Sequence, residues 1–498
     1  MPPQITLITK MIRISLPLVS IAAERLPGVP YLLVFASLAV ASHAAPNDGA
    51  RTASETVASL KIYGGLQAQV FAAEPMITNP TNIAVDERGR VWVCDVVNYR
   101  GNIGKRPEGD RILILEDQDG DGQADRSTVF YQGHDVDSAL GICVLGEKVI
   151  VSCSPDVFVL TDENGDGRAD NKELLYTKTG TQQNDHSAHA FVCGPDGNLY
   201  WNIGNSNLGV FDRSGIVKVD QFGRDVRNNG KPYRQGMAFR QNFQGDKFEV
   251  LAHNLRNSYE LTVDAFGRVW FTDNDDDGYL ATRFCFTLEG GNYGYTDELT
   301  GQLWRAGMRT GMNDAMPLRH WHQNDPGSIP NVLNNGSGSP SGVEVYEGDL
   351  LPAKLYGGIV HCEPGHNVVR VYLPQTQGAG YTAETIELID GRSDPWFRPV
   401  DAASAPDGSL MIADWYDPGV GGHRQADIDH GRIYRIAPPG ATYRCKEPDL
   451  QTAAAACAAL CSANHSERYA AWTALESMSA AAESELGRLS LSEDSRSR

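Results

Sequence analysis

Paired cysteine motifs are absent from this 498-residue sequence, whose nine cysteines include no CxxC pair and no CxxCH haem-attachment site. This excludes a covalently bound haem and the common paired-cysteine redox and metal motifs. Most of the cysteines are therefore expected to pack as small buried hydrophobes, with Cys143 and Cys153 as a candidate hairpin disulfide.

Basic residues and long apolar runs are also scarce. Lys and Arg number 43 against 63 Asp and Glu, so the net charge is −20, which argues against nucleic acid or an anionic lipid surface as a partner. An acidic surface of this kind suits calcium. After residue 45 no segment is apolar enough to cross a membrane, and before about residue 448 few segments have helical periodicity.

The first 45 residues differ from the rest. Three cations precede an apolar run from Tyr31 to Ala44, which is too short to span a bilayer comfortably and ends in small residues. We interpret residues 1–45 as a secretory signal that is cleaved near its end, with an uncleaved anchor as the alternative. The protein is therefore expected to be periplasmic or extracellular, either soluble or lightly tethered to a membrane.

One strand–turn–strand pattern recurs along the chain, as in NIAVDERGRVWVCD and ELTVDAFGRVWFTDND. Each copy has an alternating apolar run, a tight turn that ends in Gly and a second apolar run, which indicates a half-buried β-hairpin. Four close copies begin at Asn82, Ala190, Glu260 and Ala402, and two looser copies begin at Leu140 and Ser341. Six units at intervals of roughly 50–80 residues predict an all-β, six-bladed β-propeller over residues 55–440, with a pair of β-sandwiches as the alternative.

Two acidic, glycine-rich loops carry the strongest local motif, because residues 111–133 align without gaps with residues 156–178. The spacing of oxygen-bearing side chains around a Gly matches a calcium loop, although strands rather than helices flank both. The first loop supplies Asp117, Asp119, Asp121 and Asp125, with Thr128 in the last ligand position; the second, a more complete match, supplies Asp162, Asn164, Asp166, Asp170 and Glu173. We expect structural calcium at both loops, and a solvated acidic turn is the alternative.

A third acidic run, DNDDDG at residues 273–278, offers Asp275 and Asp277 as ligands for another hard cation, with a charged loop as the alternative. His186 lies just before the third repeat unit. A histidine at the start of an innermost strand points toward the mouth of a propeller, where a general base reaches a substrate. An ordinary surface histidine is the alternative.

Several segments together resemble a known family. They are DHSAHAFVCGPDGNLYWNIGN, RNSYELTVDAFGRVW, GGNYGY and WFRPVDAASAPDG, and they resemble the soluble quinoprotein glucose/sorbosone dehydrogenases. These are six-bladed propellers that use pyrroloquinoline quinone (PQQ) and calcium. The chain is most similar to large bacterial membrane-bound dehydrogenase-type proteins, in which helical HEAT-like repeats and often a cytochrome c domain follow the propeller. The resemblance covers about residues 60–440.

The resemblance implies roles for particular residues. His186 corresponds to the general base, and Asn205 takes the position of the residue that orients it. Arg256 and Asn257 correspond to residues that contact the quinone, and Arg256 also stabilises negative charge on it. Arg398 corresponds to an arginine placed against the quinone carboxylates. The loop of residues 274–277 takes the place of the catalytic calcium site.

The chain also departs from the family pattern. Asn205 stands where the family has an acidic residue, so it can hold the imidazole but cannot stabilise imidazolium as a carboxylate does. Val400 replaces the second arginine of the last blade, and Pro364 and His366 lie where the family has a lysine. The pocket for a tricarboxylate cofactor is therefore less positive.

The leading hypothesis is oxidation of a sugar or alcohol hydroxyl by hydride transfer to PQQ, with a separate cytochrome c as electron acceptor because no haem motif exists in the chain. A second hypothesis is a non-catalytic, calcium-stabilised propeller that binds carbohydrate or protein, and a propeller hydrolase is a third. Beyond the propeller, residues 449–490 have helical spacing and resemble the start of a HEAT array, and residues 491–498 are expected to be disordered. The helical piece either belongs to a shortened array or packs on the propeller.

Overall fold

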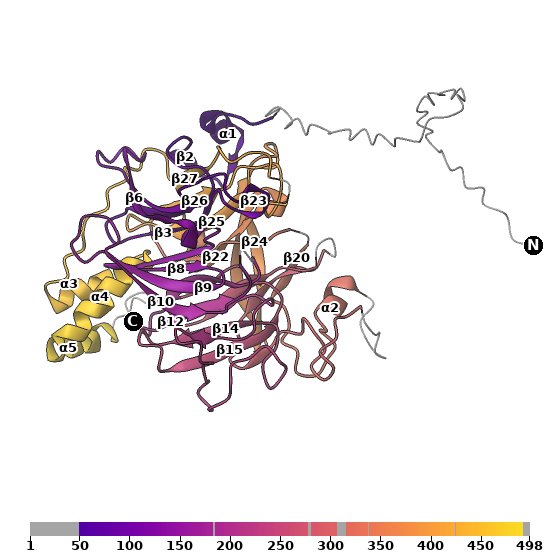
Figure 1. Cartoon of the computed structure of the whole chain (residues 1–498). Coiled ribbons are helices and arrows are strands. Elements are labelled where there is room, and N and C mark those ends of the chain that lie inside the picture. Colours follow the sequence, from indigo (N-terminus) through magenta and orange to yellow (C-terminus); the bar gives the residue numbers. More distant parts are fainter. Residues whose placement is uncertain are drawn as a thin grey trace, which may run out of the picture. The chain divides into compact units, whose positions relative to one another are not determined.

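Six β-sheets stand around a common axis in the computed structural model, which describes residues 49–182, 185–276, 280–305, 315–336, 338–423 and 425–491 (Figure 1). Each sheet has four antiparallel main strands, and three of the sheets gain a short fifth strand. The prediction of a six-bladed β-propeller is confirmed, and each of the six repeat units forms the two innermost strands of one blade.

The first three blades follow chain order. Blade 1 contains β3 (Pro80–Val85), β4 (Val91–Asp95), β5 (Asp110–Glu116) and β6 (Arg126–Gly133). Blade 2 contains β7 (Gly141–Leu145), β8 (Lys148–Cys153), β9 (Asp156–Thr161) and β10 (Asn171–Thr177), with β13 (Phe211–Asp212) at its edge. Blade 3 contains β11 (Ala188–Cys193), β12 (Leu199–Ile203), β14 (Gly236–Gln241) and β15 (Phe248–Leu255), with β19 (Gly291–Asn292) added in parallel.

The last three blades include the ring closure. Blade 4 contains β16 (Leu261–Val263), β17 (Val269–Asp273), β18 (Thr282–Phe286) and β20 (Leu333–Gly336). Blade 5 contains β21 (Val343–Tyr346), β22 (Gly358–Glu363), β23 (Val368–Gln377) and β24 (Gly380–Asp390), with β1 (Lys61–Ile62) at its edge. Blade 6 contains β25 (Pro399–Ser404), β26 (Leu410–Asp414), β27 (Arg432–Ala437) and β2 (Gln67–Ala72). Because β2 comes from the start of the described chain and pairs with β27, it locks the ring.

Short helices lie between and beyond the blades. They are the α-helices α1 (Ala53–Ser59), α2 (Met316–His320), α3 (Ala453–Ala459), α4 (His465–Met478) and α5 (Ala480–Leu489), and the 3-10 helices η1 (Arg100–Asn102), η2 (His134–Val136), η3 (Ala353–Leu355) and η4 (Pro364–His366). No helix in the described ranges is both long enough and apolar enough to span a membrane.

An aspartate organises the turn in two of the repeated hairpins. Asp86 closes the β3–β4 turn: its carboxylate accepts hydrogen bonds from the backbone of Arg90 at 2.9 Å, from the Arg90 Nε at 2.6 Å and from the indole of Trp92 at 2.9 Å. Gly89 supplies the positive φ of +80° that the turn requires. Asp264 makes the same set of contacts in blade 4, so these turns are specified by their local sequence.

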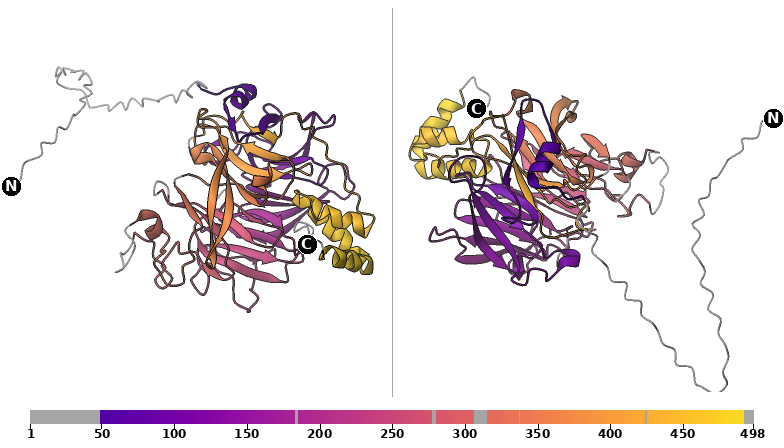
Figure 2. Two further views of the ribbon diagram at one scale, coloured as in Figure 1. Left: turned by 180° about the vertical axis from the view of Figure 1, so that it is seen from behind. Right: turned by 90° about the horizontal axis from the view of Figure 1, so that it is seen from above.

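The C-terminal helices pack on the propeller and do not project from it. Helices α3, α4 and α5 lie together against one face of the propeller, on the opposite side from α2 (Figures 1 and 2). The start of α4 enters the axial channel: Asn464 Nδ2 donates to the carbonyls of Val85 at 2.8 Å and Ser404 at 2.9 Å, and Ser466 Oγ donates to the carbonyl of Val144 at 2.8 Å. The helical segment therefore plugs one end of the channel.

A salt bridge also holds the helical segment of residues 453–489 on the propeller. Arg468 donates to Glu347 of blade 5 at 2.7 Å, and Glu347 in turn accepts the backbone N–H of Ala265 at 2.9 Å. The indole of Trp472 covers Gly197, where a Cβ would lie 2.2 Å from the ring. Helical structure over residues 449–490 is confirmed, whereas its HEAT-like character stays a prediction.

Most of the cysteines are buried, as predicted, but the predicted disulfide does not form. None of the nine forms a disulfide, and all but Cys445 and Cys461 are buried. The candidate disulfide is wrong, because Cys143 lies opposite Ile150 in the β7–β8 ladder while Cys153 lies beyond it, opposite Asp156. The predicted signal at residues 1–45 and all of the predicted tail except residue 491 lie outside the described residues.

The plug yields a stability prediction. Asn464→Ala removes the N-cap that accepts the backbone N–H of Glu467 at 2.8 Å, and it leaves two buried carbonyls without their donor. We expect a loss of about 3 kcal/mol in the free energy of unfolding, measured by denaturant titration. Thr473→Ala, on the exposed side of α4, is the matched control, and equal stability of the two variants would contradict the plug's role.

Candidate functional site

The centre of the channel is held by a carboxyl pair that the sequence analysis missed. Asn82 Nδ2 donates to Glu260 at 2.9 Å and to Asp401 at 2.7 Å, and all three residues are nearly inaccessible to solvent. Asp401 also accepts the backbone N–H of Ile83, and Glu260 accepts that of Val343, both within 2.8 Å. Polar groups thus tie the inner strands together at the axis.

The two carboxyl groups share a proton. Burial raises the pKa of Glu260 to about 7, and burial together with the neighbouring Glu260 raises the pKa of Asp401 well above its usual range. Two carboxylates this close cannot both ionise at low cost. A signal for the set did exist in the sequence: Asn82, Glu260 and Asp401 each stand seven residues before the turn glycine of their repeat, at Gly89, Gly267 and Gly408.

We call the end of the channel where the inner strands begin the mouth. It contains a cavity of about 110 Å³. Its walls include the aromatic rings of Tyr99, Tyr259 and Trp415, and the polar side chains of Asp185, Asn257, Asn274 and Arg398. Asn257, Asn274 and Arg398, which the resemblance implies, therefore meet at this cavity. Its lining residues do not include His186, Asn205 or Arg256.

The predicted base and its orienting residue are in contact. His186 Nδ1 lies 2.6 Å from Asn205 Oδ1, and because that oxygen only accepts, the imidazole carries its proton on Nδ1 and its lone pair on Nε2. Gly204 allows this packing, since a Cβ there would lie 2.5 Å from Asn257 Oδ1 and 2.7 Å from the His186 backbone. Asn205 is further anchored by its backbone N–H, which donates to the Arg256 carbonyl at 2.8 Å.

Arg256 lies beside the base but is bound to a carboxylate. Its Nε donates to Asp276 at 3.2 Å, and Asp276 also accepts from Arg305 at 2.5 Å and from the Tyr295 hydroxyl at 3.0 Å. Burial alone would raise the pKa of Asp276, but hydrogen bonds from His320 and Arg305 hold it well below its usual range. The buried Nη1 of Arg256 has no hydrogen-bond partner among the described residues.

Asn257 and Asn274 line the cavity, and each has a buried amide oxygen. Asn257 Nδ2 donates to the Asp185 carbonyl at 2.9 Å, and its Oδ1 lies against Gly204. Within the described chain, the buried Oδ1 atoms of both asparagines lack a hydrogen-bond partner. These oxygens suit a ligand that brings hydroxyl donors or a hard cation.

Arg398 is a buried cation whose hydrogen bonds go to neutral groups. It is 8% exposed, and its guanidinium donates to the carbonyls of Gly419, Pro364, Phe397 and Pro418 at 2.8–3.2 Å. Burial lowers its pKa. An anionic ligand at the mouth would relieve this desolvation. Val400 and Pro364 line the same cavity at positions where the resemblance expects further cations.

The third acidic run is used by the protein's own backbone. Asp275 is 1% exposed and accepts the N–H of Ala281 at 2.8 Å, while Asp273 accepts the N–H groups of Arg256 and Asn257. Among the described residues, no cluster of three metal-binding side chains includes Asp275. Asp277 lies outside the described residues.

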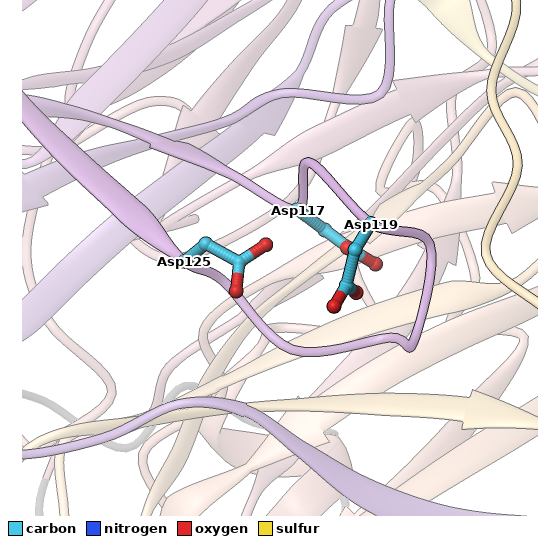
Figure 3. Close-up of side chains that lie close together, drawn as sticks. All are labelled: Asp117, Asp119 and Asp125. Carbon is cyan, nitrogen blue, oxygen red and sulfur yellow. The ribbon is translucent and has the colours of Figure 1, made fainter.

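The first acidic loop does gather its carboxylates. Oxygens of Asp117, Asp119 and Asp125 all lie within 4.8 Å of one another, and Figure 3 shows Asp125 facing the other two across the loop. Asp117 also accepts the N–H groups of Gly120 and Gly122 at 2.7 Å. Asp121, predicted as a fourth ligand, instead accepts from the backbone and side chain of Gln123.

The second loop, the better match by sequence, is arranged differently. The Asn164 amide donates to Asp170 at 3.0 Å, and Asp162 accepts three backbone N–H groups of the loop. Asp166 accepts from the backbone of Arg168 at 2.9 Å, and Glu173 lies exposed on β10. The three carboxylates that gather in the first loop thus have no counterpart here, since an amide stands where the first loop has Asp119.

Comparison with known proteins gives one family match. A family model described as "Domain of unknown function (DUF7133)" matches residues 52–440. A search among curated proteins gives no match. Similar solved structures include the PQQ domain of pyranose dehydrogenase from Coprinopsis cinerea, at 15% identity and a TM-score of 0.49, over 76% of this chain and 97% of that one.

Two further solved structures are aldose sugar dehydrogenases. The PQQ-bound enzyme from Streptomyces coelicolor is 16% identical, with a TM-score of 0.48 over 76% of this chain and 99% of that one. The apo-form enzyme from Escherichia coli is 11% identical, with a TM-score of 0.48 over 75% of this chain and 99% of that one. At these identities an activity must be argued from the site.

The axial carboxyl pair predicts a pH dependence. A raised pKa means that the folded state binds the proton more tightly than the unfolded state does. The stability that the proton contributes is complete below about pH 4 and is lost as the pH rises through about 7. For Glu260 alone this amounts to about 3 kcal/mol. We therefore expect the melting temperature to fall between pH 5 and pH 8.

Asp401→Asn carries no titrating proton at that position, so its melting temperature should change less with pH. Burial also raises the pKa values of Glu363 and Asp414 to about 7, but both remain in the variant, so the difference between the two proteins isolates the pair. Parallel pH profiles for wild type and variant would contradict a shared proton.

Calcium at the first acidic loop stays a prediction that can be measured directly. We expect calcium to raise the melting temperature of the wild type by a few degrees, because a ligand that binds only the folded state stabilises it. The double variant Asp117→Asn with Asp125→Asn should lose this effect. Asp162→Asn with Asp170→Asn in the second loop is the matched control and should keep it. If instead the second-loop variant loses the calcium effect and the first-loop variant keeps it, the sequence motif predicts the calcium site better than the carboxylate cluster does.

Proposed function

The chain belongs to the family of the domain of unknown function DUF7133, and we propose that its propeller oxidises a hydroxyl group of a sugar or alcohol at the mouth. The observation that carries the proposal is the imidazole of His186, whose Nδ1 is held by Asn205 at 2.6 Å, so that the lone pair of the neutral ring is on Nε2. A base is what such an oxidation requires, because the hydroxyl must lose its proton as the carbon loses hydrogen.

Two neighbouring residues, Asn205 and Asp185, determine how well His186 can hold a proton. Asn205 fixes the tautomer of His186 but cannot stabilise the imidazolium as a carboxylate would. Asp185, the preceding residue, carries the nearest negative charge: burial raises its pKa, but His186 and Arg100 outweigh burial and lower it. Asp185 thus stays ionised and supplies part of the stabilisation that Asn205 lacks.

One guanidinium group and the aromatic walls of the mouth fit PQQ. Arg398 would hold a carboxylate, since it is buried with only neutral carbonyls as hydrogen-bond partners, and Tyr99 and Trp415 line the same cavity. Arg256 precedes the cavity-lining Asn257 in the chain, and its Nη1, unpaired among the described residues, would hold an oxygen. The chemistry that the quinone supplies when bound is acceptance of the two electrons and the hydrogen lost from carbon.

The remaining parts of the proposal rest on the sequence. Export is supported by the signal-like residues 1–45, and structural calcium by the carboxylates of residues 117–125. Because the sequence has no haem-attachment motif, electrons would leave to a separate carrier such as a cytochrome c.

One observation favours a second function, the binding of a neutral carbohydrate without chemistry. The unpaired Oδ1 atoms of Asn257 and Asn274 accept hydrogen bonds, as sugar hydroxyls require, and the positions of Val400 and Pro364 bring no charge. Under this alternative the mouth is a sugar site and His186 is an ordinary polar contact.

The test is a titration of the purified chain with PQQ and calcium, followed by dye reduction with a panel of aldoses and alcohols. We expect His186→Ala to retain quinone binding and to lower kcat by roughly 10²–10⁴-fold, the usual contribution of a general base. Asn205→Asp should raise kcat, because a carboxylate stabilises the imidazolium. Val400→Arg should tighten quinone binding about tenfold by adding a charged hydrogen bond.

If neither the wild type nor Val400→Arg binds the quinone, the proposed oxidoreductase function is contradicted. Calorimetry with the same sugars then decides the alternative, since a sugar site retains binding in the wild type and weakens in Asn257→Ala.

A further inference from the structure

Three loops from three different blades meet over the mouth, and one arginine joins them. Arg100 lies in η1, between β4 and β5 of blade 1. Its Nη2 donates to Asp185 at 2.7 Å, in the loop before β11 of blade 3, and its Nη1 lies 3.1 Å from His423 Nδ1, in the loop after β26 of blade 6. Since an arginine only donates, His423 accepts through Nδ1.

The contacts around Arg100 reinforce this junction. Asn102 Nδ2 donates to Gln425 Oε1 at 2.7 Å, which is a second link between the loops of blades 1 and 6. The ring of Tyr99 packs edge-on against Trp415 at 6.2 Å, and Gly422 lets the two loops approach, since a Cβ there would lie 2.6 Å from the Tyr99 ring. The backbone of Arg100 takes a φ of +49°, a conformation that a non-glycine residue adopts only under such constraint.

The junction also fixes the loop that carries His186. The carbonyl of Asp185 lies 2.9 Å from both Asn257 Nδ2 and His189 Nε2, so the side chain and the backbone of this residue are both held. His186 follows directly in the chain. A change at Arg100 is therefore transmitted to the imidazole through one peptide unit.

The same loops limit the size of the cavity. Tyr99, Asp185, Trp415 and Gly422 all line it, and with Arg100 in place its volume is about 110 Å³. Sites for small molecules usually measure about 300–1,000 Å³. A sugar or a quinone therefore needs these loops to separate before it can enter fully.

We propose that Arg100 is a positioning residue: it latches the three loops, sets the orientation of His186 and must release Asp185 or His423 when a ligand enters. The role in catalysis rests on the function proposed above, but the latch itself does not. Because the ion pair is partly exposed, with 28% and 36% of the two side chains accessible, the latch is weak enough to open repeatedly.

Hydrogen exchange of the full chain tests the latch without any ligand. Arg100→Ala should raise amide exchange about 5–10-fold in segments 98–106, 185–189 and 415–423, and leave the strands of blades 4 and 5 unchanged. Asp185→Asn, which keeps the side-chain volume, should have a smaller effect on the same segments. Arg240→Ala is the matched control, because the Arg240–Glu249 pair is similarly exposed at 24% and 31%, and Arg240, which also pairs with Glu289, lies far in sequence from all three segments.

Measurements of kcat and KM then test whether Arg100 positions His186. In a protein that oxidises its substrate, Arg100→Ala should lower kcat about tenfold with a smaller change in KM, and Arg100→Lys should recover part of kcat, since one ammonium reaches Asp185 or His423 but not both. Unchanged exchange in all three segments, or a change in KM alone, would overturn the proposal. If exchange rises but neither PQQ nor any sugar binds, the role of Arg100 in holding the loops is supported and the proposed function is contradicted.

Discussion

Six sheets that face one axis leave a channel whose walls must be joined, and this propeller joins them through a buried, proton-sharing carboxyl pair. Glu260 and Asp401 belong to blades 4 and 6, and Asn82 of blade 1 donates to both. The other side of the Asn82 amide accepts the N–H of Ile142 in blade 2, and Glu260 accepts that of Val343 in blade 5. Two ionised carboxylates at this buried site would repel each other, so packing of the inner strands depends on the protonation of the pair.

The two ends of the channel are then closed by different means. At one end Asn464 acts both as the N-cap of α4 and as a donor to two blades, so the helical segment is part of the propeller's own hydrogen bonding. At the other end the closure consists of loops held by the exposed Arg100–Asp185 pair. Buried hydrogen bonds cost more to break than exposed ion pairs do. Opening to solvent is therefore easier at the mouth, which is lined by Asp185, the residue before His186.

How far the sequence predicts this structure depends on the range of the interactions. The hairpins were predictable because Asp86 and its counterparts bind their own turn within six residues. The meeting of His186 with Asn205 followed from the resemblance. The gathering of carboxylates in the first calcium loop alone was not predictable, because counting oxygen-bearing residues treats Asn164 like an aspartate, whereas its amide donates to Asp170. The plug was left open, since Asn464 meets Val85 across 379 residues and no local pattern encodes that contact.

The orientation of one amide links the base, the latch and the choice of ligand. Asn257 directs its Nδ2 to the Asp185 carbonyl, and its Oδ1, which has no hydrogen-bond partner among the described residues, lies against Gly204. Such an oxygen accepts from a sugar hydroxyl, whereas a quinone oxygen needs a donor there. Turning the amide would break its bond to Asp185, the residue that Arg100 also holds. A ligand that accepts from Asn257 must therefore loosen the same loop that positions His186, so release of the latch and recognition of the cofactor become one event.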